Sequence, residues 1–214
     1  TKSYHVQTPD EKSKADSLAK MFIDIGAASR QQVLDLGIQV GCPVSYRPIA
    51  FDLLNDRICG SYLDDASGMV TMVEVAQQLA AVPHKSTVYL VGTVWEEFNA
   101  RGAMMAARSV HPDMAVCLLG PGAGDTPDLK GTTNVVMEGG PAVTLFNFHG
   151  KGTLNGCVAH KGMYALMKRA AADSGLSLQR SAGRGALSDT AYLQLEDMGV
   201  PCLDMGCPDR YSHS

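Results

Sequence analysis

Apolar runs alternate with helical-period segments over most of this chain, from about residue 55 onward. A short apolar run is typical of a strand covered on both faces, and apolar residues spaced three and four positions apart are typical of a helix packed against a sheet. Strands and helices that alternate in this way predict an α/β fold. We expect strands at residues 87–94, 114–119, 142–148, 176–180 and 200–205, and helices at residues 69–80, 100–110, 158–174 and 191–198.

One expected strand ends on two adjacent acids, Glu96 and Glu97, in the run TVYLVGTVWEEFNARG. The β-branched and aromatic residues of this run suit a buried strand, and ligands of open α/β sheets bind beyond the carboxyl ends of the strands. A pair of acids can also simply begin a helix, where it complements the helix dipole. The choice between these interpretations depends on the other polar residues near strand ends.

Asp64 and His213 are candidates of the same kind. Asp64 stands with Asp65 in the turn SYLDDASG before an expected helix, where an aspartate can also serve as a cap, and His213 follows the last expected strand. Carboxylate oxygens and an imidazole nitrogen are ligands that zinc, cobalt or manganese accept. One of two adjacent glutamates can bind an ion while the other takes a proton from the attacking water. The pattern predicts a metal-dependent hydrolase.

Composition disfavours several other classes of protein. The net charge is -4 and the pI is near 5.8, so the chain lacks the basic surface that nucleic-acid binding requires. No apolar run approaches the roughly 18 residues of a membrane span, and no signal peptide opens the sequence. The six cysteines are scattered without a CxxC pair, which is typical of reduced thiols and favours a cytoplasmic protein.

The beginning of the chain has a different character. Residues 1–20 are polar and predict a loop, and residues 29–36 predict a short helix capped by Ser29, with strands of a small β-rich unit on either side. We expect part of a β-rich domain and a linker at residues 1–55, and an α/β catalytic domain at residues 56–214. Because the sequence opens on Thr rather than Met, we also expect an incomplete copy of a longer protein.

A series of motifs makes the chain recognisable. The segments LDDASG, WEEFNARGA, GDTPDLKG, SDTAYLQ and VPCLDMGCPDRYSHS, in this order, resemble the M42 family of cytoplasmic metallo-aminopeptidases, the glutamyl aminopeptidase and TET peptidase group. The run IDIGAASRQQVLDLGIQVGCPVSYRP resembles the family segment that links a small β domain to the catalytic domain. The resemblance implies a three-layer α/β/α fold with a mixed sheet, similar to zinc peptidases, plus part of the β-rich dimerisation domain.

The resemblance also implies a function and roles for individual residues. It implies two divalent metal ions per subunit (zinc, cobalt or manganese), peptide substrates with a free amino terminus, and self-assembly into dimers or larger oligomers. Asp64 would bridge both ions, Glu97 and His213 would each bind one ion, and Glu96 would be the general base. Asp65 would orient the loop, through an unusual cis peptide bond between the two aspartates.

Two departures from the family pattern leave other hypotheses open. Where the family ends its next strand on a metal-binding Asp, this sequence has Cys117 or Leu119, depending on the gap, and a cysteine could act as a soft ligand. The family's upstream His-x-Asp has no counterpart before residue 56. The alternatives to an active aminopeptidase are therefore a non-catalytic member that acts in assembly or peptide binding, and an amide-bond hydrolase of the same fold that acts on non-peptides.

Overall fold

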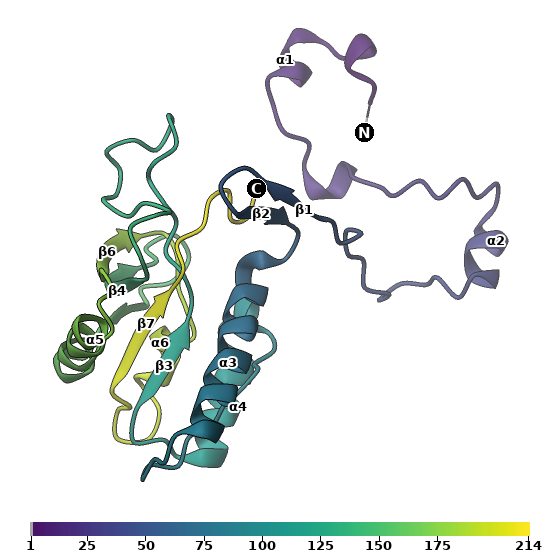
Figure 1. Ribbon diagram of the computed structural model, residues 1–214. Coiled ribbons are helices and arrows are strands. Elements are labelled where there is room, and N and C mark those ends of the chain that lie inside the picture. Colours follow the sequence, from purple (N-terminus) through teal and green to yellow (C-terminus); the bar gives the residue numbers. More distant parts are fainter. Residues whose placement is uncertain (1) are drawn as a thin grey trace. The chain divides into compact units, whose positions relative to one another are not determined.

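The computed structural model describes residues 2–214, which form two compact units that divide between Arg47 and Pro48 (Figure 1). This division lies earlier in the chain than the boundary expected after residue 55, because the β hairpin at residues 50–60 belongs to the second unit. The extent of a β-rich domain stays a prediction.

Short helices joined by extended segments make up the first unit: η1 (Tyr4–Val6), α1 (Pro9–Lys12), η2 (Leu18–Lys20) and α2 (Arg30–Asp35). The expected short helix is confirmed by α2, where Ser29 Oγ accepts a hydrogen bond from the backbone N–H of Gln32 at 3.3 Å. Of the strands expected on either side of α2, those after it are confirmed by the hairpin at residues 50–60. The strand expected before it is wrong, because no segment between residues 2 and 47 pairs into a sheet. Apolar side chains such as Phe22, which is 70% exposed, are not buried there, and isolated strands need a buried apolar face to be stable.

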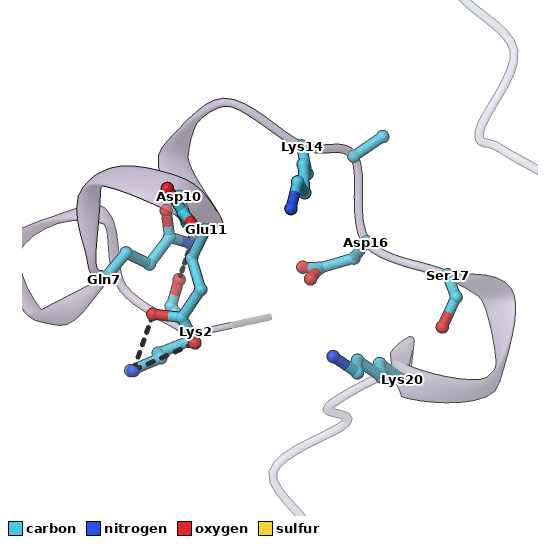
Figure 2. A pocket seen from close by; sticks show the side chains of 9 residues that line it. Lys2, Gln7, Asp10, Glu11, Lys14, Asp16, Ser17 and Lys20 are labelled. Carbon is cyan, nitrogen blue, oxygen red and sulfur yellow. Dashed lines mark hydrogen bonds and ion pairs between the residues drawn. The ribbon is translucent and has the colours of Figure 1, made fainter.

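Polar contacts stabilise the start of α1, and Figure 2 shows the contact between Lys2 and Glu11 among them. Thr8 Oγ1 accepts a hydrogen bond from the Glu11 backbone N–H, and the Glu11 carboxylate accepts one from the Thr8 backbone N–H at 2.7 Å, so the two residues form a capping box. Lys2 Nζ lies 2.9 Å from Glu11 Oε2. The bond from the Thr8 backbone and the contact with Lys2 lower the pKa of Glu11 to about 2. The adjoining hollow of about 350 Å³ is lined by polar and charged side chains of this same segment, which indicates a local turn rather than a binding site.

The second unit contains two sheets. Strands β1 (Ala50–Leu53) and β2 (Arg57–Gly60) form an antiparallel hairpin. The larger, five-stranded sheet runs in the order β3-β7-β4-β5, with β6 on the other edge of β4. Its strands are β3 (Ala115–Leu118), β4 (Ala142–Phe148), β5 (Gly156–Val158), β6 (Gln179–Arg184) and β7 (Cys202–Gly206). Because β3 is parallel to β7 while β4 is antiparallel to it, the sheet is mixed, as the family resemblance implied.

Helices cover both faces of this sheet (Figure 1). The helices of this unit are α3 (Leu63–Ala81), η3 (Glu96–Phe98), α4 (Arg101–Val110), α5 (Lys161–Asp173) and α6 (Thr190–Leu193). Of these, α4 and α6 pack on one face of the sheet and α5 packs on the other. Neighbouring residues of β7 point to opposite faces: Cys202 joins a core cluster with α4 and α6, whereas Leu203 packs with Met163 of α5. The α/β/α prediction is therefore confirmed. Among residues 2–214, no helix combines the length and the apolar character needed to cross a membrane.

The buried strand expected at residues 87–94 is wrong. This segment is extended but pairs with no other described strand, and Val88, Tyr89 and Leu90 are 45%, 58% and 43% exposed. A strand is defined by hydrogen bonds to a neighbour, which a favourable composition does not supply by itself. The end of the segment is still held in place, since Val94 C=O accepts a hydrogen bond from the backbone N–H of Gly102 at 3.0 Å.

Candidate metal centre

The two aspartates at the start of α3 have different surroundings. Asp65 is the capping residue, because its Oδ1 accepts hydrogen bonds from the backbone N–H of Gly68 at 2.8 Å and from Ser67 Oγ at 3.1 Å. Neither Asp64 nor Asp65 has helical dihedral angles, and the peptide bond between them is cis, as the family resemblance implied. The Asp64 carboxylate does not cap the helix and lines a pocket instead.

Glu96 and Glu97 lie on a single 3₁₀ turn, η3, rather than directly at a strand end. The turn lies between residues with left-handed dihedral angles, Trp95 (φ 62°) before it and Asn99 (φ 64°) after it. Successive side chains on a 3₁₀ helix diverge by about 120°. Glu97 is therefore exposed, while Glu96 is partly buried.

His213 arrives from the loop after β7 and meets two of these acids. Its Nε2 lies 3.2 Å from Asp64 Oδ2 and 3.1 Å from Glu97 Oε1. Ser212 Oγ also donates a hydrogen bond to Asp64 Oδ2, at 2.8 Å. One ligand atom each from Asp64, Glu97 and His213 lies within 4.8 Å of the others. The structure thus brings together the three residues for which we predicted a metal-binding role, and the role itself stays a prediction.

This trio fits a divalent metal ion in both chemistry and spacing. Zinc takes carboxylate oxygen and imidazole nitrogen at about 2.0–2.2 Å in tetrahedral sites, so ligand atoms around one ion stand roughly 3.5 Å apart. The 3.1 and 3.2 Å separations within the trio are close to this value. Glu96 does not join the trio and remains available for proton transfer.

The pKa of Glu96 suits proton transfer near neutral pH. Burial raises the pKa to about 7, with further increases from the charges of Asp189, Glu97 and Asp64 and an opposing effect of His213. A general base works best when its pKa lies near the working pH. The environment of Glu96 therefore favours the predicted base role, which stays a prediction.

A large pocket opens beside these groups. Its volume is about 810 Å³, and its lining includes Asp64, Glu96, Glu97 and His213 together with the loop at residues 119–122 and the segment 181–188, which is the end of β6 and the loop after it. A pocket of this size can hold a short peptide segment. Asp64, Glu97 and His213 are themselves part of this lining.

Two acids of this region were missed by the sequence prediction. Asp189 Oδ2 accepts a hydrogen bond from Thr93 Oγ1 at 3.0 Å, but its Oδ1 is buried without a hydrogen-bond partner among the described residues. Asp209 Oδ1 is buried in the same way, within the part of the chain that the structure describes. Burial is the main cause that raises the pKa of each. Both residues stand in motifs quoted for the family resemblance, SDTAYLQ and CPDRYSHS, which was the available signal.

A third acid, Asp204 on β7, lines the inner end of the pocket and is only 2% exposed. It accepts hydrogen bonds from Ser188 Oγ at 2.7 Å, from Thr190 Oγ1, and from Cys157 Sγ at 3.4 Å. Burial raises its pKa. These three donors satisfy the carboxylate, so Asp204 serves the structure of the pocket rather than ligand binding.

Neither candidate position at the end of β3 supplies an acid. Burial, with the nearby charge of Asp204, raises the pKa of the Cys117 thiol well above its usual range. The role of this cysteine as a soft ligand stays a prediction. Leu119 lines the pocket but carries no ligand atom. All six cysteines are free thiols, as expected.

Comparisons with known proteins place this geometry in context. The family model described as "M42 glutamyl aminopeptidase" matches residues 1–214. The Escherichia coli (strain K12) protein named "Putative aminopeptidase SgcX" is 37% identical over 214 residues, which are 100% of this chain and 57% of that relative. A second protein of that strain, "Putative aminopeptidase FrvX", is 30% identical over 98% of this chain and 57% of its own length. The chain thus spans a little over half the length of these relatives.

Two solved structures share the fold of this chain, each at 28% sequence identity. A TET aminopeptidase from the marine sediment archaeon Thaumarchaeota archaeon SCGC AB-539-E09 has a TM-score of 0.86 at 28% identity, covering 98% of this chain and 58% of its own. The aminopeptidase APDkam598 from the archaeon Desulfurococcus kamchatkensis has a TM-score of 0.88 at 28% identity, covering 97% of this chain and 57% of its own. The architecture of the chain is therefore similar to that of these two aminopeptidases.

Proposed function

Because the chain belongs to the M42 glutamyl aminopeptidase family, we propose that it acts as a metal-dependent aminopeptidase, removing residues one at a time from the amino end of peptides. The observation that carries this proposal is the meeting of Asp64, Glu97 and His213 around one point, with Glu96 beside them. The names of its relatives as aminopeptidases support the same activity.

In this proposal each residue has a distinct task. Asp64, Glu97 and His213 would hold a divalent ion (zinc, cobalt or manganese), which when bound lowers the pKa of water to about 7 and polarises a carbonyl oxygen. Glu96 accepts the proton of the attacking water and then returns it to the amine of the departing peptide. The raised pKa of Glu96 supports both steps, because a group with a pKa of about 7 can take and return a proton near neutral pH.

We also propose the substrates, the number of ions, the oligomeric state and the cellular location. The substrates are peptides with a free amino terminus, and the pocket of about 810 Å³ has room for the terminal residue and its neighbours. The family resemblance implies two ions per subunit, a homo-oligomer of two or more copies, and a place in the cytoplasm. One similar solved structure is named a TET aminopeptidase, which supports the resemblance to the TET peptidase group.

A second candidate function is a non-catalytic member that binds peptides or takes part in assembly. The observation that favours it is the lack of an acid at Cys117 and at Leu119. With only the trio as ligands, one ion would bind and the second position would lack a carboxylate. This hypothesis predicts weak occupancy and no hydrolysis that a chelator can abolish.

Activity measurements on the full-length protein distinguish the two functions. We expect release of the amino-terminal residue from short peptides in the presence of zinc, cobalt or manganese, and loss of this release in a chelator. Glu96→Gln should lower kcat by about 10²–10⁴-fold while metal content stays unchanged. Glu74→Gln, which changes an exposed glutamate of α3, is the matched control and should keep the parent rate. Hydrolysis by Glu96→Gln at the parent rate would show that the assigned base is wrong.

A further inference from the structure

The loop after β7 runs beside the loop that follows β3, and this brings an unassigned acid to the metal centre. β3 and β7 are parallel neighbours, and the backbone N–H of Leu119 donates to the Met205 carbonyl oxygen at 2.9 Å. The pairing resumes further on, where Gly122 forms an isolated bridge with Asp209 and the Ala123 N–H donates to the Asp209 carbonyl oxygen at 2.7 Å. Asp209 is therefore fixed against the same loop that fails to supply an acid.

Asp209 lines the pocket, and one oxygen of its carboxylate has no hydrogen-bond partner among the described residues. Asp209 lines the pocket together with Asp64 and His213, and both of these are its charged neighbours. A Cβ atom on Gly122 would stand 4.0 Å from Asp209 Oδ1, so this oxygen lies beside the Gly122 backbone. Oδ1 is buried and has no hydrogen-bond partner among residues 2–214. A buried oxygen without a partner is destabilising unless it binds something.

We propose that Asp209 supplies the carboxylate of the second ion position, beside Asp64, in place of an acid at the end of β3. This inference rests on the proposed metal-dependent function. It assigns the missing ligand to the neighbouring parallel strand, whose exit loop opens at the same edge of the sheet. Because carboxyl ends of parallel strands converge there, either loop can deliver an acid to the same place.

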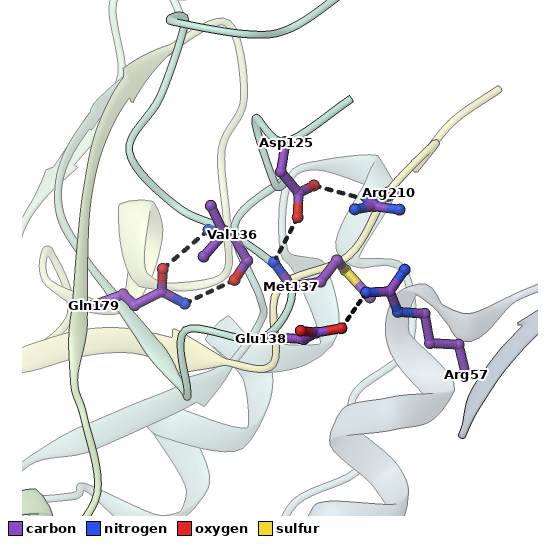
Figure 3. Close-up of polar contacts among 7 residues, drawn as sticks. All are labelled: Arg57, Asp125, Val136, Met137, Glu138, Gln179 and Arg210. Carbon is purple, nitrogen blue, oxygen red and sulfur yellow. Dashed lines mark hydrogen bonds and ion pairs between the residues drawn. The ribbon is translucent and has the colours of Figure 1, made fainter. Parts of the chain in front are cut away.

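The next residue explains why Asp209 is left free and yet well placed. Arg210, which could have paired with it, donates from Nε to Asp125 Oδ1 at 2.8 Å instead (Figure 3). Asp125 Oδ2 also accepts a hydrogen bond from the Met137 N–H at 3.1 Å. The bridge to Gly122 on one side and the contact between Arg210 and Asp125 on the other hold Asp209 in position, as a ligand requires.

Asp189 is the competing candidate, since its Oδ1 also lacks a partner among the described residues. Its other oxygen is bound by Thr93, and the charges that act on it are those of Asp204 and Asp65 rather than Asp64 and His213. Asp189 influences Glu96 instead. Asp209 lines the same pocket as the predicted metal ligands Asp64 and His213, whereas Asp189 is not among the residues that line it.

Metal content and metal affinity of the full-length protein test this assignment. Elemental analysis of the parent should find up to two ions per chain, and titration calorimetry with zinc should resolve a tight and a weaker site. Asp209→Asn should weaken the second site by at least about 10-fold and leave the first unchanged. Asp113→Asn, which removes an exposed acid outside the pocket, should bind both ions as the parent does.

A thermal melt in a chelator separates a ligand from a merely structural residue. If Asp209 is a ligand, the ion-free Asp209→Asn protein is at least as stable as the ion-free parent, and only the stabilisation by zinc is reduced. Lower stability of the variant without ions would overturn the assignment, and so would two unchanged sites. A parent that binds no ion at all would instead refute the proposed function.

Discussion

His213 Nε2 lies 3.2 Å from Asp64 Oδ2, although the two residues stand near opposite ends of the second unit's sequence. The loop after β7 and the start of α3 thus meet at one point, and Glu97 joins them from a third segment. A site assembled from three separate segments forms only when the unit is folded. Ion binding should therefore also stabilise the folded state.

Replacing the histidine should remove the first ion. His213→Ala leaves two carboxylates, which repel each other without an ion or an imidazole between them. We expect a loss of zinc affinity of at least about 100-fold, because even the loss of a group that only orients a ligand costs about 10–100-fold. His84→Ala, at an exposed histidine whose ring lies 3.1 Å from the Val82 carbonyl oxygen and which is outside the pocket, is the control and should keep the parent affinity. Equal zinc affinity of the two variants would argue against His213 as a ligand.

The pKa of Glu96 should respond to Asp189. Burial is the largest cause that raises this pKa to about 7, and the Asp189 charge is the next. Asp189→Asn removes that charge and can keep the bond from Thr93, so the pKa of Glu96 should fall. The ion-free protein allows a direct measurement by carbon NMR titration of the Glu96 carboxyl group.

The pKa of Glu96 also predicts how activity and stability depend on pH. A base must be deprotonated, so kcat/KM should rise with pH through the Glu96 pKa, and Asp189→Asn should move this rise to lower pH. In the ion-free parent, a raised carboxyl pKa gives stability that is present below about pH 4.5 and lost as pH rises through about 7. A Glu96 pKa that stays the same or rises in Asp189→Asn would contradict this account.

The Asp125–Arg210 pair predicts a different pH dependence. The hydrogen bond from Arg210 and the one from the Met137 N–H lower the pKa of Asp125 to about 2. Because this value is below the unfolded value of about 3.9, the stabilisation is present above about pH 4 and is lost as pH falls through about 2. Thermal melts from pH 2 to 5 should show a smaller decrease for Asp125→Asn than for the parent, and parallel curves would exclude the contribution.

The same substitution should also loosen the loop that carries the ligands. Arg210 stands between Asp209 and His213 in the sequence, and its side chain is bound by Asp125. The segment next to Asp125's partner Met137 is held by two further contacts (Figure 3). Gln179 forms hydrogen bonds with the Val136 backbone, and Glu138 forms an ion pair with Arg57. We therefore expect weaker zinc binding in Asp125→Asn, by a smaller factor than in His213→Ala. Zinc titrations of the two variants under the same conditions provide the comparison.

The core prediction concerns Leu203 of β7, which is fully buried between β4 and α5. Leu203→Ala should lower the free energy of unfolding by about 2–5 kcal/mol, since it removes buried methyl groups and leaves a cavity. Leu54→Ala, at a leucine that is 86% exposed, should change it by less than about 0.5 kcal/mol. Denaturant unfolding of both variants measures the difference, and similar values would place Leu203 outside the core.

Much of the second unit could be predicted because its pattern is local. The helices α3, α4 and α5 and the strands β3, β4 and β7 lie where apolar spacing indicated, although their ends differ by a few residues. The segment at residues 87–94 shows the limit of this reasoning, because its residues suit a strand but only a neighbour can complete one.

The site shows the same division between local and tertiary information. Asp64, Glu97 and His213 were found from residue type and from their places near expected strand ends. Asp189 and Asp209 were missed, because their importance comes from burial and from oxygens without partners, which are properties of the folded chain. The sequence likewise could not show that Asp65 caps the helix while Asp64 lines the pocket, because this difference depends on the folded structure.

The most direct test of the central claim is an anomalous difference map from a zinc-soaked crystal of the full-length protein. We predict a peak about 2.0–2.2 Å from a carboxylate oxygen of Asp64, a carboxylate oxygen of Glu97 and an imidazole nitrogen of His213. A map with no peak among these three side chains, or with zinc bound only elsewhere, would contradict the account.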